Sequence, residues 1–391
     1  MIYLDNAATT KVRREVLDEM LPYFSEYYTN PSSIYSPSRM VSKKVEEARK
    51  LIAGTIGAEA SEIYFTSGGS ESDNWAIKKI MISRMNKGKH MITTKVEHHA
   101  VLESCKYLES LGFEVTYLNV NEDGLIDLNE LESSIREDTI LVSIMAANNE
   151  IGTLMPLKEI GSICKKHKVL FHTDAVQAYG NIPIDVNEMN IDLLSTSAHK
   201  IEGPKGIGFL YVRKGVMITP LISGGMQEKG KRAGTTNAPG IIGFAKAAEL
   251  KFSEIKKNNE YVLNLREHLI DRVLSEILYV RLNGSRDKRL VGNANFSFQF
   301  IEGEGMLLKL DALGICASSG SACTSGSLDP SHVLLAIGLP HEIAHGSLRL
   351  TMNHENTMEE IDYTVDKLKE VISGLRSMSP LYEDFVKKGS N

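Results

Sequence analysis

The chain of 391 residues has few cysteines, no long apolar run and no excess of positive charge. Its four cysteines include no Cys-x-x-Cys pair, which argues against a disulfide framework and fits a reducing compartment. No apolar run approaches the ~18 residues that a membrane span requires. The formal net charge is −6, whereas nucleic-acid-binding domains usually carry a basic surface. The first residues also lack the pattern of a secretory signal, so we expect a cytoplasmic globular protein that binds neither membranes nor nucleic acids.

Short apolar segments alternate with longer helix-like patterns between about residues 60 and 215. The expected strands are Glu62 to Thr66, His90 to Thr94, Phe113 to Leu118, Thr139 to Met145, Val169 to His172, Asp192 to Thr196 and Ile207 to Val212. Such alternation is typical of an α/β protein with a mostly parallel sheet. Ligands bind such sheets in the loops at the carboxyl ends of the strands, so those loops are where we expect the chemistry.

The pattern changes after Pro239. Residues 241–277 are expected to form long helical segments, and residues 279–375 mix short strands and helices. We therefore expect a large domain over residues 13–257. A small α+β domain would combine residues 1–12 with residues 258–391.

Thr66 to Ser72 is a glycine- and serine-rich segment between an expected strand and an expected helix. Glycines allow an anion to approach the backbone closely, and the N-terminus of a helix favours a phosphate group. The alternative is an ordinary strand-to-helix turn with hydroxyl N-caps. This segment is not a P-loop, because no Gly-Lys-Ser/Thr follows it.

Two further segments bring polar side chains to strand ends. Asp174 lies in His172 to Gln177, and Lys200 ends Ser195 to Lys200. Singly, Asp174 is compatible with a helix N-cap and Lys200 with a surface charge. Pyridoxal phosphate chemistry needs a lysine for a Schiff base, an acid for the ring nitrogen and a cradle for the phosphate. All three occur at strand ends of one α/β unit, so together they indicate this cofactor.

Further motifs extend this pattern over nearly the whole chain. They run from Tyr3 to Thr10, through Glu97 to Val101 and Ala147 to Gly152, to Arg349. In content, order and spacing the chain resembles the cysteine desulfurases of the class V aminotransferase group, which are pyridoxal phosphate enzymes of fold type I. The resemblance implies an α/β fold with a seven-stranded, mostly parallel sheet in the large domain and a smaller α+β domain.

The resemblance also implies roles for residues at the cofactor's ring. Lys200 would bind pyridoxal phosphate as a Schiff base and move the substrate's α-proton. Asp174 would pair with the ring nitrogen, and Gln177 would hydrogen-bond the phenolic oxygen. His98, rather than its neighbour His99, would stack on the ring and take part in catalysis.

Other implied roles concern the anionic groups of cofactor and substrate. The implied phosphate ligands are Ser70, Ser197, His199 and, from the partner subunit of a homodimer, Thr235. Gly69 would also bind the cofactor. Asn149 would contact cofactor and substrate, and with Arg349 it would hold the substrate carboxylate. A guanidinium fork suits that anion.

Residues 317–327 are all small, comprising five Ser, two Gly, two Ala, one Cys and one Thr. Such a segment buries little apolar area, so we expect it to stay mobile. A cysteine there is unusual, because free cysteine is normally buried, as we expect for Cys105, Cys164 and Cys316. The segment resembles the catalytic loop of the longer-loop (group I) desulfurases, which implies that Cys323, in a loop of about residues 317–330, is the nucleophile.

The implied reaction removes sulfur from L-cysteine. The Cys323 thiolate would attack the substrate's sulfur, giving L-alanine and a Cys323 persulfide. The persulfide would pass to an acceptor protein, such as an iron–sulfur scaffold or a carrier for tRNA thiolation. The alternative within the family is a class V enzyme that acts on another amino acid or prefers selenocysteine.

One motif suggests a different class of protein. His341 to His345 matches the zinc-protease pattern His-Glu-x-x-His, with two histidines one helical turn apart. Leu348 and Thr351 stand where the extended metzincin pattern requires Gly and His. We therefore expect no metal site, and we interpret this segment as the approach to Arg349.

Overall fold

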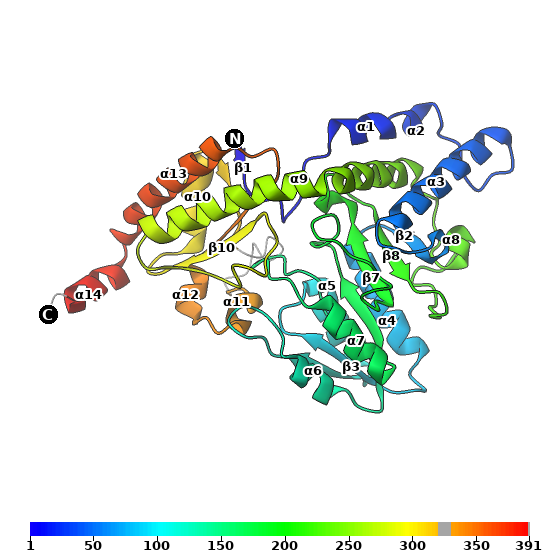
Figure 1. Cartoon of the computed structure of the whole chain (residues 1–391), viewed down its shortest axis with the longest axis horizontal. Coiled ribbons are helices and arrows are strands. Elements are labelled where there is room, and N and C mark those ends of the chain that lie inside the picture. Colours follow the sequence, from blue (N-terminus) through cyan, green and yellow to red (C-terminus); the bar gives the residue numbers. More distant parts are fainter. Residues whose placement is uncertain (320–329, 390–391) are drawn as a thin grey trace.

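The structure, a computed structural model, describes residues 1–319 and 330–389 (Figure 1). Its large sheet has seven strands in the order β2-β8-β7-β6-β5-β3-β4. The strands are β2 (Ile63–Thr66), β3 (His90–Thr94), β4 (Glu114–Leu118), β5 (Thr139–Ser143), β6 (Leu170–Asp174), β7 (Leu193–Ser197) and β8 (Gly208–Val212). Only β8 runs against the others, so the prediction of a seven-stranded, mostly parallel sheet is confirmed. Strand β5 ends at Ser143, two residues before Met145, where the strand was predicted to end.

Consecutive residues of these strands pack on opposite faces of the sheet, as the two-residue period of a strand requires. Met91, Leu141 and Leu193 join one apolar cluster, whereas the residues that follow them, such as Ile92 and Val142, join another. Helices α4 (Gly69–Ser83) and α5 (His99–Ser110) supply the first cluster. On the opposite face lie α1 (Arg14–Met20), α3 (Ser36–Gly54), α7 (Leu157–His167) and the first half of α9 (Ala238–Glu276). Helices therefore cover both faces, as expected for parallel strands.

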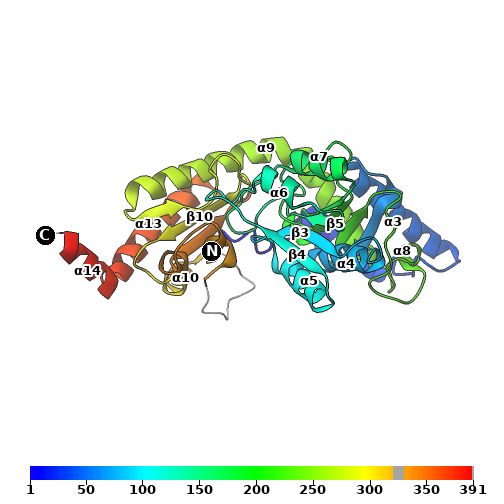
Figure 2. The ribbon, with the colours of Figure 1, turned by 90° about the horizontal axis from the view of Figure 1, so that it is seen from below.

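A second, smaller assembly lies beside the large sheet (Figures 1 and 2). Its antiparallel sheet has the order β12-β10-β9, formed by β9 (Val280–Leu282), β10 (Asn293–Phe298) and β12 (Ser347–Thr351). The second half of α9 packs on it together with α10 (Gly303–Ala312) and α13 (Met358–Arg376). The remaining elements are short or peripheral: α2 (Pro22–Ser25), η1 (Ala60–Glu62), α6 (Leu128–Ser134), η2 (Ala198–Lys200), α8 (Gln227–Gly230), α11 (His332–Ala336), α12 (His341–His345) and α14 (Pro380–Gly389).

Helix α9 joins the two assemblies as one continuous helix of 39 residues rather than as separate segments. At 1.5 Å per residue it is roughly 60 Å long, and Figure 1 shows it running along both parts of the molecule. The predicted domain boundary at residue 257 falls inside this helix and stays a prediction. Among the helices of the described chain, none combines the length and apolar character that crossing a bilayer requires.

The N-terminal segment belongs to the small assembly. Strand β1 (Ile2–Tyr3) pairs with β11 (Ile315–Cys316), and Leu4 is buried in the core formed by α9, α10 and α13. Residues 5–10 then cross to the large sheet, where Thr10 bonds the carbonyl oxygen of His199. The first ten residues therefore connect the two assemblies at the carboxyl ends of the large sheet's strands.

Candidate active site

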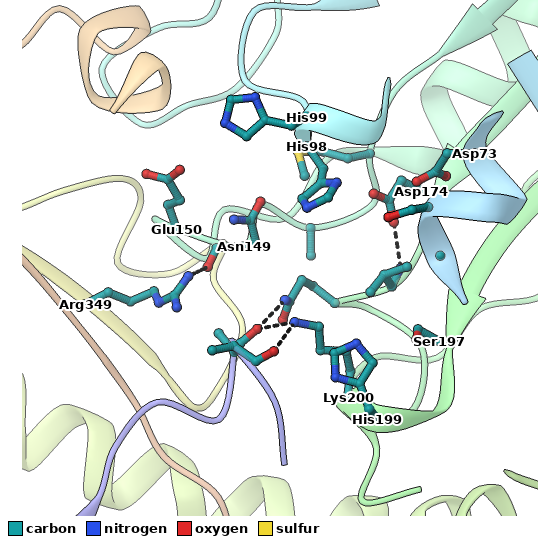
Figure 3. A pocket seen from close by; sticks show the side chains of 18 of the residues that line it. Asp73, His98, His99, Asn149, Glu150, Asp174, Ser197, His199, Lys200 and Arg349 are labelled. Atoms are coloured by element: carbon teal, nitrogen blue, oxygen red, sulfur yellow. Dashed lines mark hydrogen bonds between the residues drawn. The ribbon is translucent and has the colours of Figure 1, made fainter. Parts of the chain in front are cut away.

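A cavity of about 250 Å³ opens where the parallel strands end, between the large sheet and the small assembly. Side chains from both assemblies point into it (Figure 3). Ten of the residues predicted from the sequence line it: Gly69, Ser70, His98, Asn149, Asp174, Gln177, Ser197, His199, Lys200 and Arg349. Residues up to 280 positions apart in the chain thus gather around one space of a size suited to a small organic molecule.

Two predicted site residues are not part of this wall. Thr235 is exposed and does not line the cavity of its own chain. Cys323 lies outside the described residues. The roles assigned to both stay predictions.

Lys200 lies in the short η2 turn that follows strand β7. Its Nζ donates hydrogen bonds to the carbonyl oxygens of Ala7 and Ala8, the latter at 2.8 Å. The Nε2 amide of Gln177 donates to the same Ala7 carbonyl oxygen at 2.9 Å. The N-terminal segment therefore forms one wall of the cavity and holds the lysine amine toward it.

Asp174 is the last residue of strand β6 and is 5% exposed. Its Oδ1 accepts a hydrogen bond from the Val176 backbone N–H at 2.9 Å. Burial raises the pKa of Asp174, and the nearby His98 opposes that shift. A cation in the cavity would favour the ionised carboxylate, so this side chain suits the protonated ring nitrogen of pyridoxal phosphate.

His98 caps helix α5, and its Nδ1 accepts the Ala100 backbone N–H at 3.1 Å. In the neutral ring the proton is therefore on Nε2. The ring points into the cavity (Figure 3). The ring of His99 lies 4.9 Å from that of His332, and both of these rings also line the cavity. The choice of His98 over His99 stays a prediction.

The N-terminus of α4 lies at one end of the cavity. Its N-cap, Gly68, has no side chain to cap the helix, so the alternative of a hydroxyl N-cap is wrong. Gly68 has φ +150°, and a Cβ on Gly69 would lie 2.5 Å from Cγ2 of Val176, so both positions require glycine. The helix N-terminus, with the Ser70 and Ser197 hydroxyls beside it, is a donor set that fits a phosphate group.

His199 lies at the same end, with its Nδ1 3.1 Å from Oγ1 of Thr9. Burial, and then the neighbouring Lys200, lower the pKa of His199 to about 4. The ring is therefore neutral at physiological pH. It can serve a phosphate as a hydrogen-bond donor.

Arg349 lies in the middle of strand β12 and is 2% exposed. Its Nη1 donates to the Asn149 carbonyl oxygen at 2.9 Å, and its Nη2 to Oδ1 of Asp5 at 2.8 Å. The Nε atom is buried and has no hydrogen-bond partner among the described residues. A guanidinium fixed on two sides with a donor unused is suited to receive a carboxylate.

The sequence analysis missed several polar groups that shape the cavity: Asp5, the carbonyl oxygens of Ala7 and Ala8, Asp73, Glu150 and His332. Glu150 is buried, which raises its pKa, and it accepts a hydrogen bond from the Ser331 hydroxyl. Asp73 could have been found from helical periodicity, because it lies on the same side of its helix as the buried Ile77 and Ile80. The backbone carbonyl contacts leave no signal in the sequence.

The zinc-protease motif does not form a metal site in the described chain. His341 and His345 flank the five-residue helix α12. Neither gathers with two further His, Cys, Asp or Glu side chains among residues 1–319 and 330–389. The segment leads into strand β12, which carries Arg349.

Comparison with known proteins extends these observations to the whole chain. Residues 2–364 match the aminotransferase class-V family. A cysteine desulfurase IscS from Methanosarcina thermophila is 56% identical over 380 residues, covering 97% of this chain and 94% of that protein. One from Clostridium botulinum is 55% identical over 388 residues, covering 99% and 98%.

Solved structures agree with the relatives. A NifS-like protein superposes with a TM-score of 0.90 at 40% identity, covering 96% of this chain and 100% of that one. The structure described as SspA in complex with cysteine superposes with a TM-score of 0.80 at 38% identity, covering 91% and 100%.

The fold and the cavity are thus those of a fold-type I pyridoxal phosphate enzyme. The chain belongs to the cysteine desulfurases of the class-V aminotransferase family. It is an enzyme that uses pyridoxal phosphate to remove sulfur from cysteine. The predictions of family, fold class, activity and cofactor are confirmed, and the resemblance is to desulfurases rather than to class V enzymes acting on other amino acids.

Proposed function

We propose that the cavity binds pyridoxal phosphate and L-cysteine together and that Cys323 receives the sulfur. One observation carries the proposal: Lys200, Asp174 and Arg349, from three distant parts of the chain, line the same cavity. Lys200 would hold the cofactor covalently, Asp174 its ring nitrogen and Gln177 its phenolic oxygen. Its phosphate would be held by Ser70, Ser197 and His199, and by Thr235 of a second subunit, with Gly69 also in contact with the cofactor.

When bound, pyridoxal phosphate supplies an electron sink that stabilises the negative charge left when an amino acid loses its α-proton. Lys200 Nζ takes that proton, and the two carbonyl oxygens that it contacts, those of Ala7 and Ala8, orient the amine. His98 presents its Nε2–H to the same space, because its Nδ1 is engaged by Ala100. His98 is thus placed to move a proton to or from sulfur.

Arg349 and Asn149 would hold the substrate carboxylate. Asp5 and the Asn149 carbonyl oxygen fix the guanidinium, so it pays little of the conformational entropy that a free side chain would lose on binding. The small assembly therefore holds the substrate's carboxylate, while the large sheet supplies the base.

The proposal for Cys323 rests on the sequence and on the surroundings of the other cysteines. Cys105 and Cys164 are buried, and burial raises the pKa of Cys164 to about 12 and that of Cys105 further, so neither is a thiolate at neutral pH. Cys316, which is less buried than predicted, pairs with Tyr3 in a sheet. None of these three cysteines lines the cavity.

On each side of segment 320–329, a described residue either lines the cavity or contacts a residue that does. Ser318 exchanges backbone hydrogen bonds with Arg349, and the ring of His332 lines the cavity wall. In the proposed step, a bond forms between Cys323 Sγ and the substrate's sulfur while the substrate's Cβ–S bond breaks. The electron pair of the broken bond stays with the three-carbon fragment, which takes up one proton at Cβ, regains a proton at Cα from Lys200 and leaves as L-alanine. The enzyme keeps a persulfide.

A homodimer follows from the assignment of Thr235 to a second subunit's phosphate site. The exposure of Thr235, away from the cavity of its own chain, supports that assignment. Nearby surface segments carry exposed apolar side chains, Ile34 at 88% and Met226 at 80%, which a partner subunit would cover. The persulfide would then pass to an iron–sulfur scaffold or another sulfur acceptor.

The proposal is tested by adding L-cysteine to the purified yellow enzyme and recording its visible spectrum, L-alanine and, with a reductant present, sulfide. We expect a spectral change and equal amounts of both products. L-Serine, which lacks sulfur, is the control and should yield neither product. A spectral change without sulfide would point to a different amino-acid reaction, and failure to bind pyridoxal phosphate would refute the site.

Arg349→Lys keeps the positive charge but loses the guanidinium fork. We expect KM for L-cysteine to rise about tenfold to a hundredfold, the scale of a lost hydrogen bond to a charged group, with a smaller change in kcat. Steady-state kinetics measure both constants. Arg14→Lys, on the exposed face of α1, is the matched control and should leave both unchanged. An unchanged KM in Arg349→Lys would contradict the assigned role.

A further inference from the structure

A second buried carboxylate lies beside Asp174, and the proposed reaction does not use it. Asp73 is on helix α4, one turn beyond the predicted phosphate ligand Ser70, and is 1% exposed. It lines the cavity. Asp73, Asp174 and His98 each have a side-chain nitrogen or oxygen within 4.8 Å of the others', and Figure 3 shows the two carboxylates side by side.

Behind Asp73 the structure has a row of buried polar side chains without a cation. Ser143 Oγ lies 2.8 Å from Nδ1 of His172, and Nε2 of His172 lies 3.0 Å from Ser195 Oγ and 3.6 Å from Oδ1 of Asp73. Burial lowers the pKa of His172 to about 3, so the imidazole is neutral. His172 therefore offers Asp73 no compensating charge.

The charged and titratable groups that face Asp73 can be named element by element. Strand β6 contributes Asp174 and His172, and the segment before α5 contributes Glu97 and His98. Burial, followed by the charge of Asp174, raises the pKa of Asp73 well above its usual range, and the Ser195 hydroxyl opposes this shift only in part. Oδ1 of Asp73 has no hydrogen-bond partner among the described residues.

Two buried carboxylates this close cannot both ionise at low cost, so the pair retains one proton. Asp174 has the better support for a negative charge, because it accepts the Val176 N–H and faces His98 and Lys200. Asp73 accepts no hydrogen bond from a backbone N–H of the described residues, and neither His98 nor Lys200 is among the groups that lower its pKa. The proton therefore belongs on Asp73 and the negative charge on Asp174.

We propose that Asp73 is a positioning residue: as a neutral carboxylic acid it donates a hydrogen bond toward Asp174 and keeps the pair's single negative charge on the carboxylate that faces the cofactor's ring nitrogen. The inference rests on the proposed function, which assigns Asp174 to that nitrogen. The inference predicts that position 73 requires a side chain that can donate a hydrogen bond to Asp174, and that this side chain need not be able to carry a charge.

The test compares Asp73→Asn, which keeps shape and a donor, with Asp73→Leu, which keeps approximate shape and loses the donor. The probe is pyridoxamine 5′-phosphate, which cannot form a Schiff base with Lys200, titrated into the cofactor-free enzyme. Trp75, the chain's single tryptophan, is buried two residues from Asp73 and reports binding by its fluorescence. Circular dichroism checks that both variants are folded.

We expect Asp73→Asn to bind the probe within about threefold of the wild-type Kd and Asp73→Leu to bind about tenfold to a hundredfold more weakly. Wild-type affinity in Asp73→Leu, or equal losses in both variants, would overturn the inference. Failure of the wild-type enzyme to bind the probe would instead refute the proposed cofactor site.

A second measurement uses Asp73→Asn alone, so the inference stays testable if Asp73→Leu does not fold. A carboxyl group whose pKa is higher in the native than in the unfolded state makes the native protein bind more protons, so stability falls as pH rises between the two values. We expect the Tm of the cofactor-free wild type to fall more steeply from pH 5 to 9 than that of Asp73→Asn. Equal slopes would show that Asp73 is ionised and would overturn the inference.

Discussion

Sulfide release by the Lys200→Ala variant is expected to fall by about 10⁴-fold or more. The change removes both the amine that would hold the cofactor and the base that takes the substrate's α-proton, and proton transfer by a positioned side chain alone contributes about 10² to 10⁴-fold. Sulfide and L-alanine are measured after reconstitution with pyridoxal phosphate.

The matched control is Lys214→Ala, which removes an exposed lysine after strand β8 and should keep full activity. Circular dichroism of the cofactor-free Lys200→Ala protein separates loss of the amine from loss of the fold. A folded Lys200→Ala enzyme with more than about a tenth of wild-type activity would contradict the assignment, since no proton-transfer group would then have been lost.

Cys323→Ser is expected to stop sulfide release while leaving substrate binding intact. Replacing one sulfur with oxygen removes the atom that forms the persulfide, and loss of a nucleophile reduces turnover by about 10³-fold or more. L-Cysteine should still change the visible spectrum, because Lys200, Asp174 and Arg349 remain. The measurement pairs that spectrum with product assays and with mass spectrometry of the protein after exposure to L-cysteine.

Cys316→Ser provides the control, because Cys316 lies on strand β11 and does not line the cavity. It should retain activity and gain the mass of one sulfur atom after exposure to L-cysteine, whereas Cys323→Ser should not. Full sulfide release by Cys323→Ser would assign the nucleophile to another group.

The strands of the large sheet could be predicted from the sequence because each is a short apolar run bounded by turn residues. Their ends were less certain. Strand β5 stops at Ser143, although the apolar run continues through Met145. Beyond Ser143 the chain is joined to the end of β6 by isolated backbone hydrogen bonds, which the carbonyl oxygens of His172 and Asp174 accept. Helix α9 was expected in pieces, but packing against both cores stabilises one continuous helix.

The site was predictable where residue type and motif carry the chemistry, as at Lys200, Asp174 and His98. It was not predictable where contacts join segments far apart in the chain. The Lys200 amine donates hydrogen bonds to the backbone carbonyl oxygens of Ala7 and Ala8. Every residue type has such an oxygen, so the sequence does not mark these two positions. Asp5 reaches Arg349 only because the small sheet brings strand β12 beside the N-terminal segment. Such pairings depend on the tertiary fold and leave no local pattern.

The N-terminal segment also determines when the enzyme becomes complete during its synthesis. Ile2 pairs with Ile315, and Asp5 with Arg349, so these residues wait for partners that are made more than 300 residues later. Contacts of such wide separation form slowly, and domains that fold early do so without them. The large sheet can therefore form before Lys200 has acquired its carbonyl partners, so we expect cofactor binding to develop only after the N-terminal segment has docked.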